Sequence, residues 1–302
     1  MMNKLNLLLI ITFSLFLGAC KDKAWDERTE NLNKGTITLY AESSYQTLVE
    51  ELVKSYENVY PESKIEVRFA PDNAVLDAMF TDKTRMIITG TALSKEQLDR
   101  IKSVNEVAAE QYVIGREAIA VIASLSNPDT VFDFDAFLQS RSAGYSGVYE
   151  KTGFVFNEEN SAMVSQLLGN MTGYNNMFSL GNLDTVVGYV SKNTAAIGFI
   201  SFAALSDPDD SLTQAILRQV KVLPVAKADS TGKKIVIPMS QSSIASNDYP
   251  FQRYVTVVKG NTPELLGTGF VNFLYRSKAS RIMLKAGLVP EKMPERRINI
   301  VE

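Results

Sequence analysis

Three short stretches of the sequence combine hydroxyl, amide and glycine residues where a strand pattern gives way to a helix pattern. They are Glu42-Ser43-Ser44, Thr89-Gly90-Thr91 and Glu159-Asn160-Ser161. In open α/β sheets, ligands sit outside the carboxyl ends of the strands, and the free N–H groups of a helix start hold anions. Hydroxyl groups add further donors. Together the three stretches predict a cleft that holds a small oxyanion such as phosphate or sulfate.

Each stretch also has an ordinary structural explanation. Ser43 and Gln46 fit the S-x-x-Q capping box, and Asn160 and Ser161 are common helix N-caps. Thr89-Gly90-Thr91 suits a plain turn. Taken singly, each stretch is explained more simply by local structure, so only their joint occurrence favours an anion site.

The charged residues near these stretches are less specific. Arg116 follows a glycine where the chain is expected to cross between lobes, and it either reaches the cleft or is a solvated surface arginine. Glu158 and Glu159 are adjacent carboxylates, but neighbours on one loop rarely share a substrate. The chain has no histidine, which excludes Ser-His-Asp and Cys-His catalysis and His-containing zinc sites. We therefore expect no enzyme activity, no metal and no cofactor.

The N-terminus has the form of a lipoprotein signal. An apolar run from Leu5 to Leu17 is too short for a comfortable transmembrane helix and ends in Leu17-Gly18-Ala19-Cys20. This ending resembles the lipobox of bacterial lipoproteins, whose cysteine is lipidated. An uncleaved anchor and a plain secretory peptide are the alternatives. Because Cys20 is the only cysteine, the mature chain suits an extracytoplasmic compartment.

The net charge and the N-terminal segment limit the kinds of partner that the chain is expected to bind. With a net charge of −3, the 302-residue chain has no basic footprint for nucleic acid. Residues 1–19 are predicted to be the signal peptide, and residues 20–34 a polar tether that holds the globular part off the membrane. No second membrane span is expected.

The periodicity from residue 36 onward predicts an α/β protein of two lobes. Strands are expected at 36–40, 65–69 and 86–89, alternating with helices, and this rhythm implies parallel strands with right-handed crossovers. Ser94 begins a capping box. Further strands are expected at 111–124, 154–156, 195–202, 220–225, 235–237 and 254–258, with helices at the C-terminus. The predicted lobes are residues 35–113 with 239–302, and residues 114–238.

The order of the stretches resembles one family. The lipobox, "YAESSYQTLVEELVKSYENVYPE", "RMIITGTALSKEQL", "IGREAIAVIASLSNP", "FNEENSAMVSQLL" and "VVGYVSKNTAAIGFISFAAL" are followed by "YPFQRYVTVVKG" and "GFVNFLYRSKASRIMLKAGLVP". The chain resembles the phosphate-binding substrate-binding proteins of phosphate ABC importers, in their lipoprotein form. The resemblance implies a type II periplasmic-binding fold: two lobes, each a mostly parallel sheet flanked by helices, joined by two hinge strands and closing over a ligand. It also implies a monomer that delivers inorganic phosphate or a similar oxyanion to a membrane permease.

The resemblance assigns ligand residues by position, with departures. Phosphate contacts fall on Ser43 and Ser44, on Thr89 to Thr91, and on Asn160-Ser161. The family's acidic position before the second stretch is Arg85 here, and its arginine position is Thr91. A second family arginine, three residues after Ser161, is Val164.

The lost groups matter for affinity and selectivity. Each lost guanidinium bond costs roughly 1.5–3 kcal/mol. Glu42 is the hypothetical replacement for the lost aspartate, accepting a hydrogen bond from a protonated phosphate. Otherwise, its charge repels the ligand. A relative that binds another small anion, and a surface lipoprotein that keeps the fold for sensing or adhesion, are the alternative functions.

Overall fold

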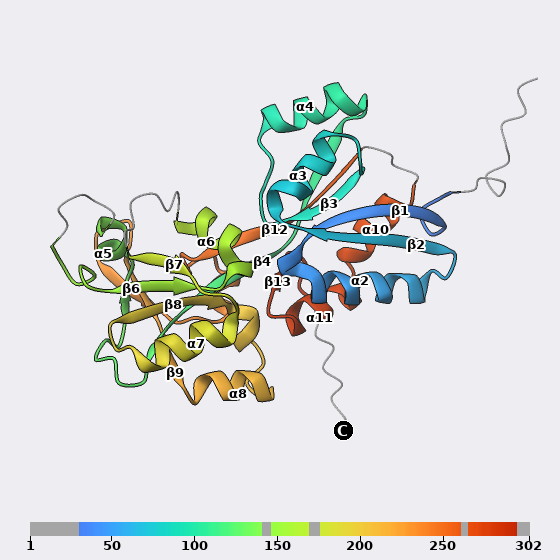
Figure 1. The fold of residues 1–302 in the computed structure, drawn as a ribbon. Coiled ribbons are helices and arrows are strands. Elements are labelled where there is room, and N and C mark those ends of the chain that lie inside the picture. Colours follow the sequence, from blue (N-terminus) through green and yellow to red (C-terminus); the bar gives the residue numbers. More distant parts are fainter. Residues whose placement is uncertain (1–29, 141–145, 169–175, 261–264, 295–302) are drawn as a thin grey trace, which may run out of the picture.

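The computed structural model describes residues 30–140, 146–168, 176–260 and 265–294. Figure 1 shows two α/β halves joined by two long strands. The mixed α/β fold, with a curled sheet and flanking helices, confirms the predicted fold class. Cys20 and the predicted signal peptide lie outside the described residues, as does most of the predicted tether.

The first half is built on three parallel strands. β1 (Gly35–Glu42) pairs in parallel with β2 (Ser63–Ala70) and with β3 (Met86–Thr89), which confirms the three predicted strands. The helices of this half include α2 (Gln46–Val59), α3 (Asp72–Phe80) and α4 (Lys95–Asn105). The predicted capping box at Ser94 is present, with both reciprocal hydrogen bonds to Gln97. The crossover order places the ends of β1 and β3 side by side.

The second half repeats this arrangement. β6 (Gly153–Phe156) lies between β7 (Met177–Ser179) and β8 (Ala196–Ser201), and all three are parallel. α7 (Leu183–Lys192) packs on β8, and α6 (Ser161–Leu168) follows β6. The strand β8 is apolar on nearly every position because both of its faces are covered.

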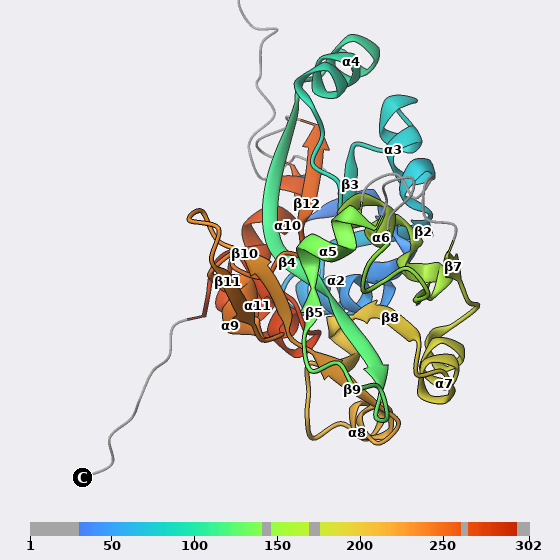
Figure 2. The ribbon, with the colours of Figure 1, turned by 90° about the vertical axis from the view of Figure 1, so that its left-hand side faces the viewer.

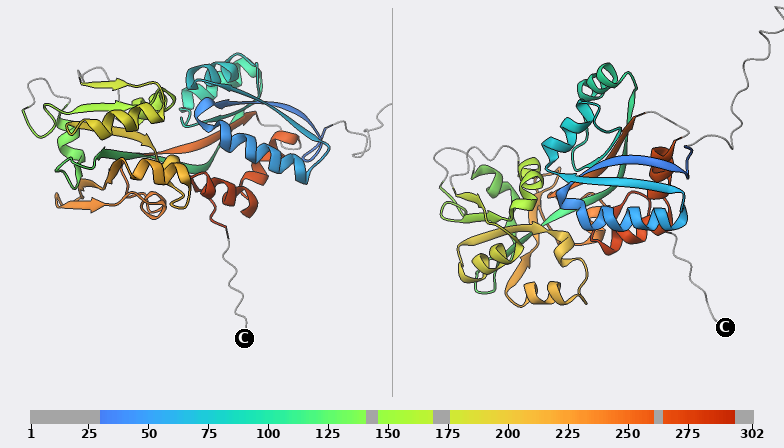
Figure 3. Two further views of the ribbon diagram at one scale, coloured as in Figure 1. Left: turned by 60° about the horizontal axis from the view of Figure 1, so that its bottom comes forward. Right: turned by 45° about the vertical axis from the view of Figure 1, so that its right-hand side comes forward.

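Two long strands connect the halves. β4 (Ala109–Ser124) and β12 (Gln252–Gly260) pair antiparallel over nine residue pairs, from Gln252 with Ala118 to Gly260 with Ala109. β12 also pairs with β3, and β4 continues into the second half, where it pairs with β8. Figure 2 shows β4 running the length of the molecule, and Figure 3 shows the two strands bridging the halves. These strands provide the predicted double connection.

The remaining elements complete the two halves. The first half gains helices from the C-terminal part of the chain, and a small sheet and short helices lie against the second half. They are η3 (Ser43–Tyr45), β5 (Phe132–Asp133), α5 (Phe134–Gln139), η4 (Glu158–Asn160), η5 (Phe202–Leu205), α8 (Ser211–Leu217), β9 (Val220–Leu223), β10 (Val225–Ala228), β11 (Lys234–Ile237), α9 (Gln241–Ala245), α10 (Leu266–Leu274), α11 (Ser277–Lys285) and β13 (Val289–Pro290). Gly287 ends α11 in the left-handed region, as a C-terminal cap requires.

The hydrophobic core is divided between the halves. One cluster joins α2 and α10 to the first sheet through residues such as Leu52 and Phe270. Another gathers aromatic side chains of the second half around Phe132 and Phe199. Ile244, from the segment that the sequence assigned to the first lobe, packs in this second cluster. The exact lobe boundaries stay a prediction.

The N-terminal end of the described chain packs on the first half. Tyr56 donates a hydrogen bond to the Leu32 carbonyl at 2.6 Å, and Lys34 pairs with Glu62 at 3.0 Å. Gly269 permits this approach, because a Cβ there would collide with the Leu32 carbonyl. The last residues of the predicted tether are therefore bound to the globular part. Across the described residues, none of the helices combines the length and the apolar character that crossing a bilayer requires.

Candidate functional site

The three predicted loops meet at one place between the halves. The loop after β1 is joined to the loop after β3, because Glu42 accepts hydrogen bonds from the Thr89 hydroxyl at 2.8 Å and from the Gly90 N–H at 2.5 Å. η3, in the first half, packs against η4, in the second. The structure therefore brings the three stretches together, as a ligand cleft between two lobes requires.

Glu42 lies at the centre of the meeting point. It is the last residue of β1 and is only 2% exposed. Besides the bonds from Thr89 and Gly90, its second oxygen pairs with the Arg253 guanidinium at 3.0 Å and lies 3.4 Å from the Ser44 hydroxyl. Burial acts to raise the pKa of Glu42, but the Arg253 charge and the bonds from Gly90 and Thr89 outweigh it and lower this pKa. The side chain is therefore an ionised carboxylate at neutral pH.

Arg253 connects the cluster to both halves. It extends from β12, is 5% exposed, and donates to Glu117 through Nε at 2.5 Å. Its Nη1 donates to the Gln166 side chain of α6 at 3.1 Å, and its Nη2 donates to Glu42. Two buried carboxylates thus share one guanidinium, whose pKa their charges raise even though burial lowers it. The arginine is fixed and always charged.

Gly90 makes room for this arginine. A Cβ at position 90 would collide with the guanidinium carbon and nitrogens of Arg253. The backbone of Gly90 is not left-handed, so the requirement for glycine here comes from close packing. The Tyr45 ring lies on another side, with its centroid 5.7 Å from the guanidinium carbon. These contacts hold the guanidinium in one position.

The Tyr45 hydroxyl completes the pairing of Glu117. Tyr45 is 2% exposed and donates a hydrogen bond to the Glu117 carboxylate. Burial and the neighbouring Glu117 charge raise the pKa of Tyr45 well above its usual value, so the hydroxyl remains a donor. The cluster of Glu42, Tyr45, Glu117 and Arg253 is therefore internally satisfied.

Asp72 extends the cluster toward solvent. Asp72 is the first residue of α3, and its Oδ1 lies 2.8 Å from the Thr89 hydroxyl oxygen, which has a single proton to share between Asp72 and Glu42. Its other oxygen lies 3.4 Å from the Thr91 hydroxyl. Burial, followed by the Glu42 charge, raises the pKa of Asp72. The Thr89 hydroxyl therefore lies between two carboxyl groups whose pKa values shift in opposite directions.

The other predicted ligand residues occupy the rim. Ser43 and Ser44 are exposed, and Thr91 is half-buried with its N–H bonded to the Thr89 hydroxyl at 3.1 Å. Asn160 is buried, and its amide donates to Asn157 at 2.6 Å, while Ser161 begins α6. Whether these groups bind a ligand stays a prediction.

The predicted capping box at Ser43 is wrong. No side-chain cap bond is present at the start of η3 or α2, and Gln46 donates instead to Glu50 at 2.9 Å. The helix α2 begins after Tyr45, whose side chain is buried and bonded to Glu117. The serines are therefore not occupied in capping α2.

Arg116 does not join the cluster. Neighbouring residues of a strand point to opposite faces, so Arg116 and Glu117 diverge. Arg116 donates to the carbonyls of Ile244 and Ala245, at 3.3 and 2.9 Å, and lies 3.9 Å from Glu291. Its guanidinium therefore ties the start of the crossing strand to α9 and to the chain after β13.

Sequence reasoning missed five residues in or next to the cluster: Tyr45, Asp72, Glu117, Gln166 and Arg253. A signal was present for two of them. Glu117 and Arg253 are charged residues inside the apolar strands expected to cross between the lobes, and the structure makes them direct partners in the β4–β12 register. A buried charge inside such a strand requires an opposite charge nearby. Identifying Glu117 and Arg253 as partners requires the register between β4 and β12, which the sequence does not provide.

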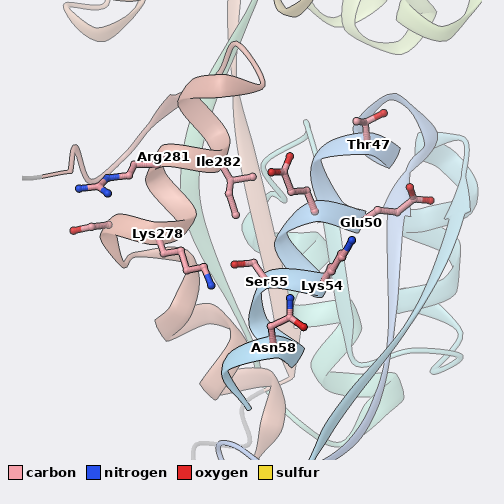
Figure 4. A pocket seen from close by; sticks show the side chains of 10 residues that line it. Thr47, Glu50, Lys54, Ser55, Asn58, Lys278, Arg281 and Ile282 are labelled. Carbon is pink, nitrogen blue, oxygen red and sulfur yellow. The ribbon is translucent and has the colours of Figure 1, made fainter. Parts of the chain in front are cut away.

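A separate groove lies on the outer surface of the first half. Figure 4 shows it between α2 and α11, with a volume of about 990 Å³ and charges of both signs from Glu50, Lys54, Lys278 and Arg281. None of its lining residues belongs to the cluster. In the described part of the chain, no group of three or more His, Cys, Asp and Glu side chains is arranged to hold a metal ion.

Comparison with known proteins assigns the fold. The family model described as "PBP superfamily domain" matches residues 26–278. An ABC-type phosphate transport receptor from Vibrio cholerae is 14% identical, with a TM-score of 0.64 over 85% of this chain and 100% of the receptor. PstS from Borrelia burgdorferi is 16% identical, with a TM-score of 0.62 over 85% of this chain and 99% of PstS.

A third similar structure contains bound phosphate. It is a putative phosphate ABC transporter substrate-binding protein with bound phosphate from Clostridium perfringens, 15% identical, with a TM-score of 0.60 over 85% of this chain and 100% of that protein. No curated relative matches the sequence. At these identities the structural matches establish a shared fold.

Proposed function

This chain belongs to the PBP superfamily, and we propose that it is an extracytoplasmic solute-binding lipoprotein that captures phosphate or a similar small oxyanion between its lobes. The observation that carries the proposal is the meeting of three donor-bearing loops beside the guanidinium of Arg253. Hydroxyl groups, a backbone N–H and an arginine are the donors that hold oxyanions in proteins. The phosphate bound in the Clostridium perfringens relative supports the choice of ligand.

The proposed mechanism is capture and delivery without chemistry. The lobes close over the ligand by bending at β4 and β12, and the closed form docks on an ABC permease. Arg253 suits this motion because it lies on a connecting strand and contacts Gln166 in the second half. From β12, the Arg253 guanidinium can contact groups of both halves. No step forms or breaks a covalent bond, so we propose no catalytic residue.

The proposed localisation rests on the N-terminal sequence. Cleavage before Cys20 and lipidation of its thiol would anchor the chain to a bacterial membrane, with the first residues as a short tether. Mass spectrometry of the protein isolated from membranes tests this point. The expected N-terminal peptide begins at an acylated Cys20, and an intact Met1 would contradict the assignment.

Anion binding is tested by thermal unfolding and calorimetry with phosphate, sulfate, arsenate and molybdate. A ligand at 100 times its dissociation constant stabilises the folded state by about 2.7 kcal/mol. Stabilisation by phosphate supports the proposal, and preference for another anion changes only the ligand. Absence of any shift would favour a fold kept for sensing or adhesion.

A further inference from the structure

The Glu42 carboxylate receives the donors that an oxyanion ligand would use. One oxygen accepts from the Thr89 hydroxyl and the Gly90 N–H, at 2.8 and 2.5 Å. The other pairs with Arg253 at 3.0 Å and lies 3.4 Å from the Ser44 hydroxyl. Three of these four donors come from the loops that the sequence predicted as ligand loops. An internal carboxylate thus accepts the bonds offered by the anion site.

An incoming anion therefore meets a site whose donors are already engaged. Arg253 offers no free charge, because Glu117 and Glu42 both pair with it. The charged and titratable groups that face Glu42 are Arg253 from β12, Glu117 from β4, Asp72 from α3 and Tyr45 from η3. Glu42 and Glu117 bring two negative charges to the single positive charge of Arg253, and Asp72 adds a further carboxyl group. Adding a phosphate without moving Glu42 would bring like charges together in a buried place.

Glu42 lies next to the protein surface along the chain. It is the last residue of β1, and the next two residues, Ser43 and Ser44, are exposed. Glu117 keeps its own bond to the Arg253 Nε and the bond from Tyr45, so the guanidinium stays in place when Glu42 leaves. The vacated donors are then the Thr89 hydroxyl, the Gly90 N–H and the Arg253 Nη2.

We propose that Glu42 is a resident anion that occupies the ligand's place, so that oxyanion capture is an exchange of the Glu42 carboxylate for phosphate. This inference rests on the proposed anion-binding function. It assigns Glu42 a role opposite to that of an acceptor for a protonated phosphate. The bound phosphate is held by the donors that Glu42 releases, and the carboxylate turns toward solvent.

The experiment is phosphate calorimetry at neutral pH on the wild type and on Glu42→Gln. Glu66→Gln is the matched control, because Glu66 is an exposed carboxylate of β2 and belongs to none of the three predicted loops. Each charge-assisted bond returned to phosphate strengthens binding by roughly tenfold or more. We expect Glu42→Gln to bind phosphate at least ~10-fold more tightly and the control to change by less than ~3-fold.

The outcomes separate the exchange from the anion-binding function. If the wild type binds phosphate and Glu42→Gln binds it equally or more weakly, the exchange is wrong and anion capture stands. If neither protein binds any oxyanion, both ideas fail. Unfolding curves verify that the variant is folded, and a second readout needs no variant. In wild-type protein labelled with carboxyl-¹³C glutamate, phosphate must shift a buried carboxyl resonance toward the solvated position, and an unchanged spectrum at saturation overturns the exchange.

Discussion

Removing the guanidinium of Arg253 should destabilise the fold strongly. In Arg253→Met, Glu42 and Glu117 keep their buried positions but lose the cation that lies 3.0 and 2.5 Å from their oxygens. The side chains of the two acids are only 3% and 10% exposed, so water cannot replace the arginine without rearrangement. Removing one partner of a buried pair costs about 3–5 kcal/mol. Because two buried carboxylates lose their partner, we expect the loss of unfolding free energy to lie near the top of that range.

Urea and thermal unfolding measure this loss. For a chain of this size, a loss of about 3–5 kcal/mol corresponds to a melting temperature lower by roughly 6–10 °C. Methionine retains the apolar stem, so the cavity contribution stays small. Arg68→Met, at an exposed position of the edge strand β2, is the control and should change stability by less than about 0.5 kcal/mol.

The pH dependence gives the prediction a second test. In the wild type the pKa of Glu42 is lowered, so its stabilising contribution is present above the ordinary value of 4.5 and is lost as the pH falls through the lowered pKa. In Arg253→Met, burial dominates and raises this pKa, so the variant gains stability as the pH falls toward 4.5. Asp72, whose raised pKa makes stability fall as the pH rises above 3.8, is present in both proteins. The stability gap should therefore narrow on acidification.

Replacing all three charged residues separates charge from packing. The triple variant Glu42→Gln/Glu117→Gln/Arg253→Met removes the anions together with the cation, and neutral replacement of a buried ion cluster is often without net cost. It should recover most of the stability that Arg253→Met loses. A cost below ~1 kcal/mol for the single variant, or a gap that widens at low pH, would refute the electrostatic reasoning.

Two further substitutions probe the same cluster. Gly90→Ala places a methyl group against the Arg253 guanidinium and should cost about 1–3 kcal/mol in urea unfolding, whereas Gly188→Ala, with no atom within 4 Å of the added Cβ, should be neutral or stabilising. Equal effects of the two would contradict the close-packing account. Tyr45→Phe removes the hydroxyl bonded to Glu117 and should cost about 1–3 kcal/mol, measured against Tyr40→Phe, which removes a hydroxyl that accepts a solvent-exposed bond from Arg68. A cost no greater than that of Tyr40→Phe would show that Glu117 does not need this donor.

The predictable part of the fold was local. The change from strand to helix near Tyr45, the capping box at Ser94 and the apolar strand β8 each follow from the periodicity of neighbouring residues, and each is present. The three stretches predicted as ligand loops were found for the same reason, because a strand followed by small polar residues is a short-range signal. Their meeting follows from parallel strands with consistent crossovers.

The contacts within the candidate site could not be predicted from neighbouring residues, because they join positions that are far apart in the sequence. Ser43 has the spacing of a capping residue, but α2 begins after Tyr45, whose hydroxyl is bonded to Glu117, 72 residues away. Glu42 and Arg253 are 211 residues apart, and their pairing depends on the register of β12 beside β3 and β4. The residue pattern around Glu42 cannot predict that Arg253, on β12, will lie beside it. The predicted ligand role of Arg116 rested on its place in the sequence, and the alternation of side chains along β4 directs it elsewhere.

Arg253 offers a physical explanation for the two arginines of the family pattern that this chain lacks. The resemblance indicated that the loop positions of two arginines are Thr91 and Val164, which removes positive charge from the rim. Arg253 supplies a guanidinium from the connecting strand, but it comes with the carboxylate of Glu117 as its strand partner. A cation neutralised by a fixed carboxylate orients an anion without adding much net attraction. In the proposed exchange, the remaining attraction depends on whether the Arg253 Nη2 faces Glu42 or the ligand. Glu42 is then the residue that would set the affinity of the proposed cleft for an oxyanion.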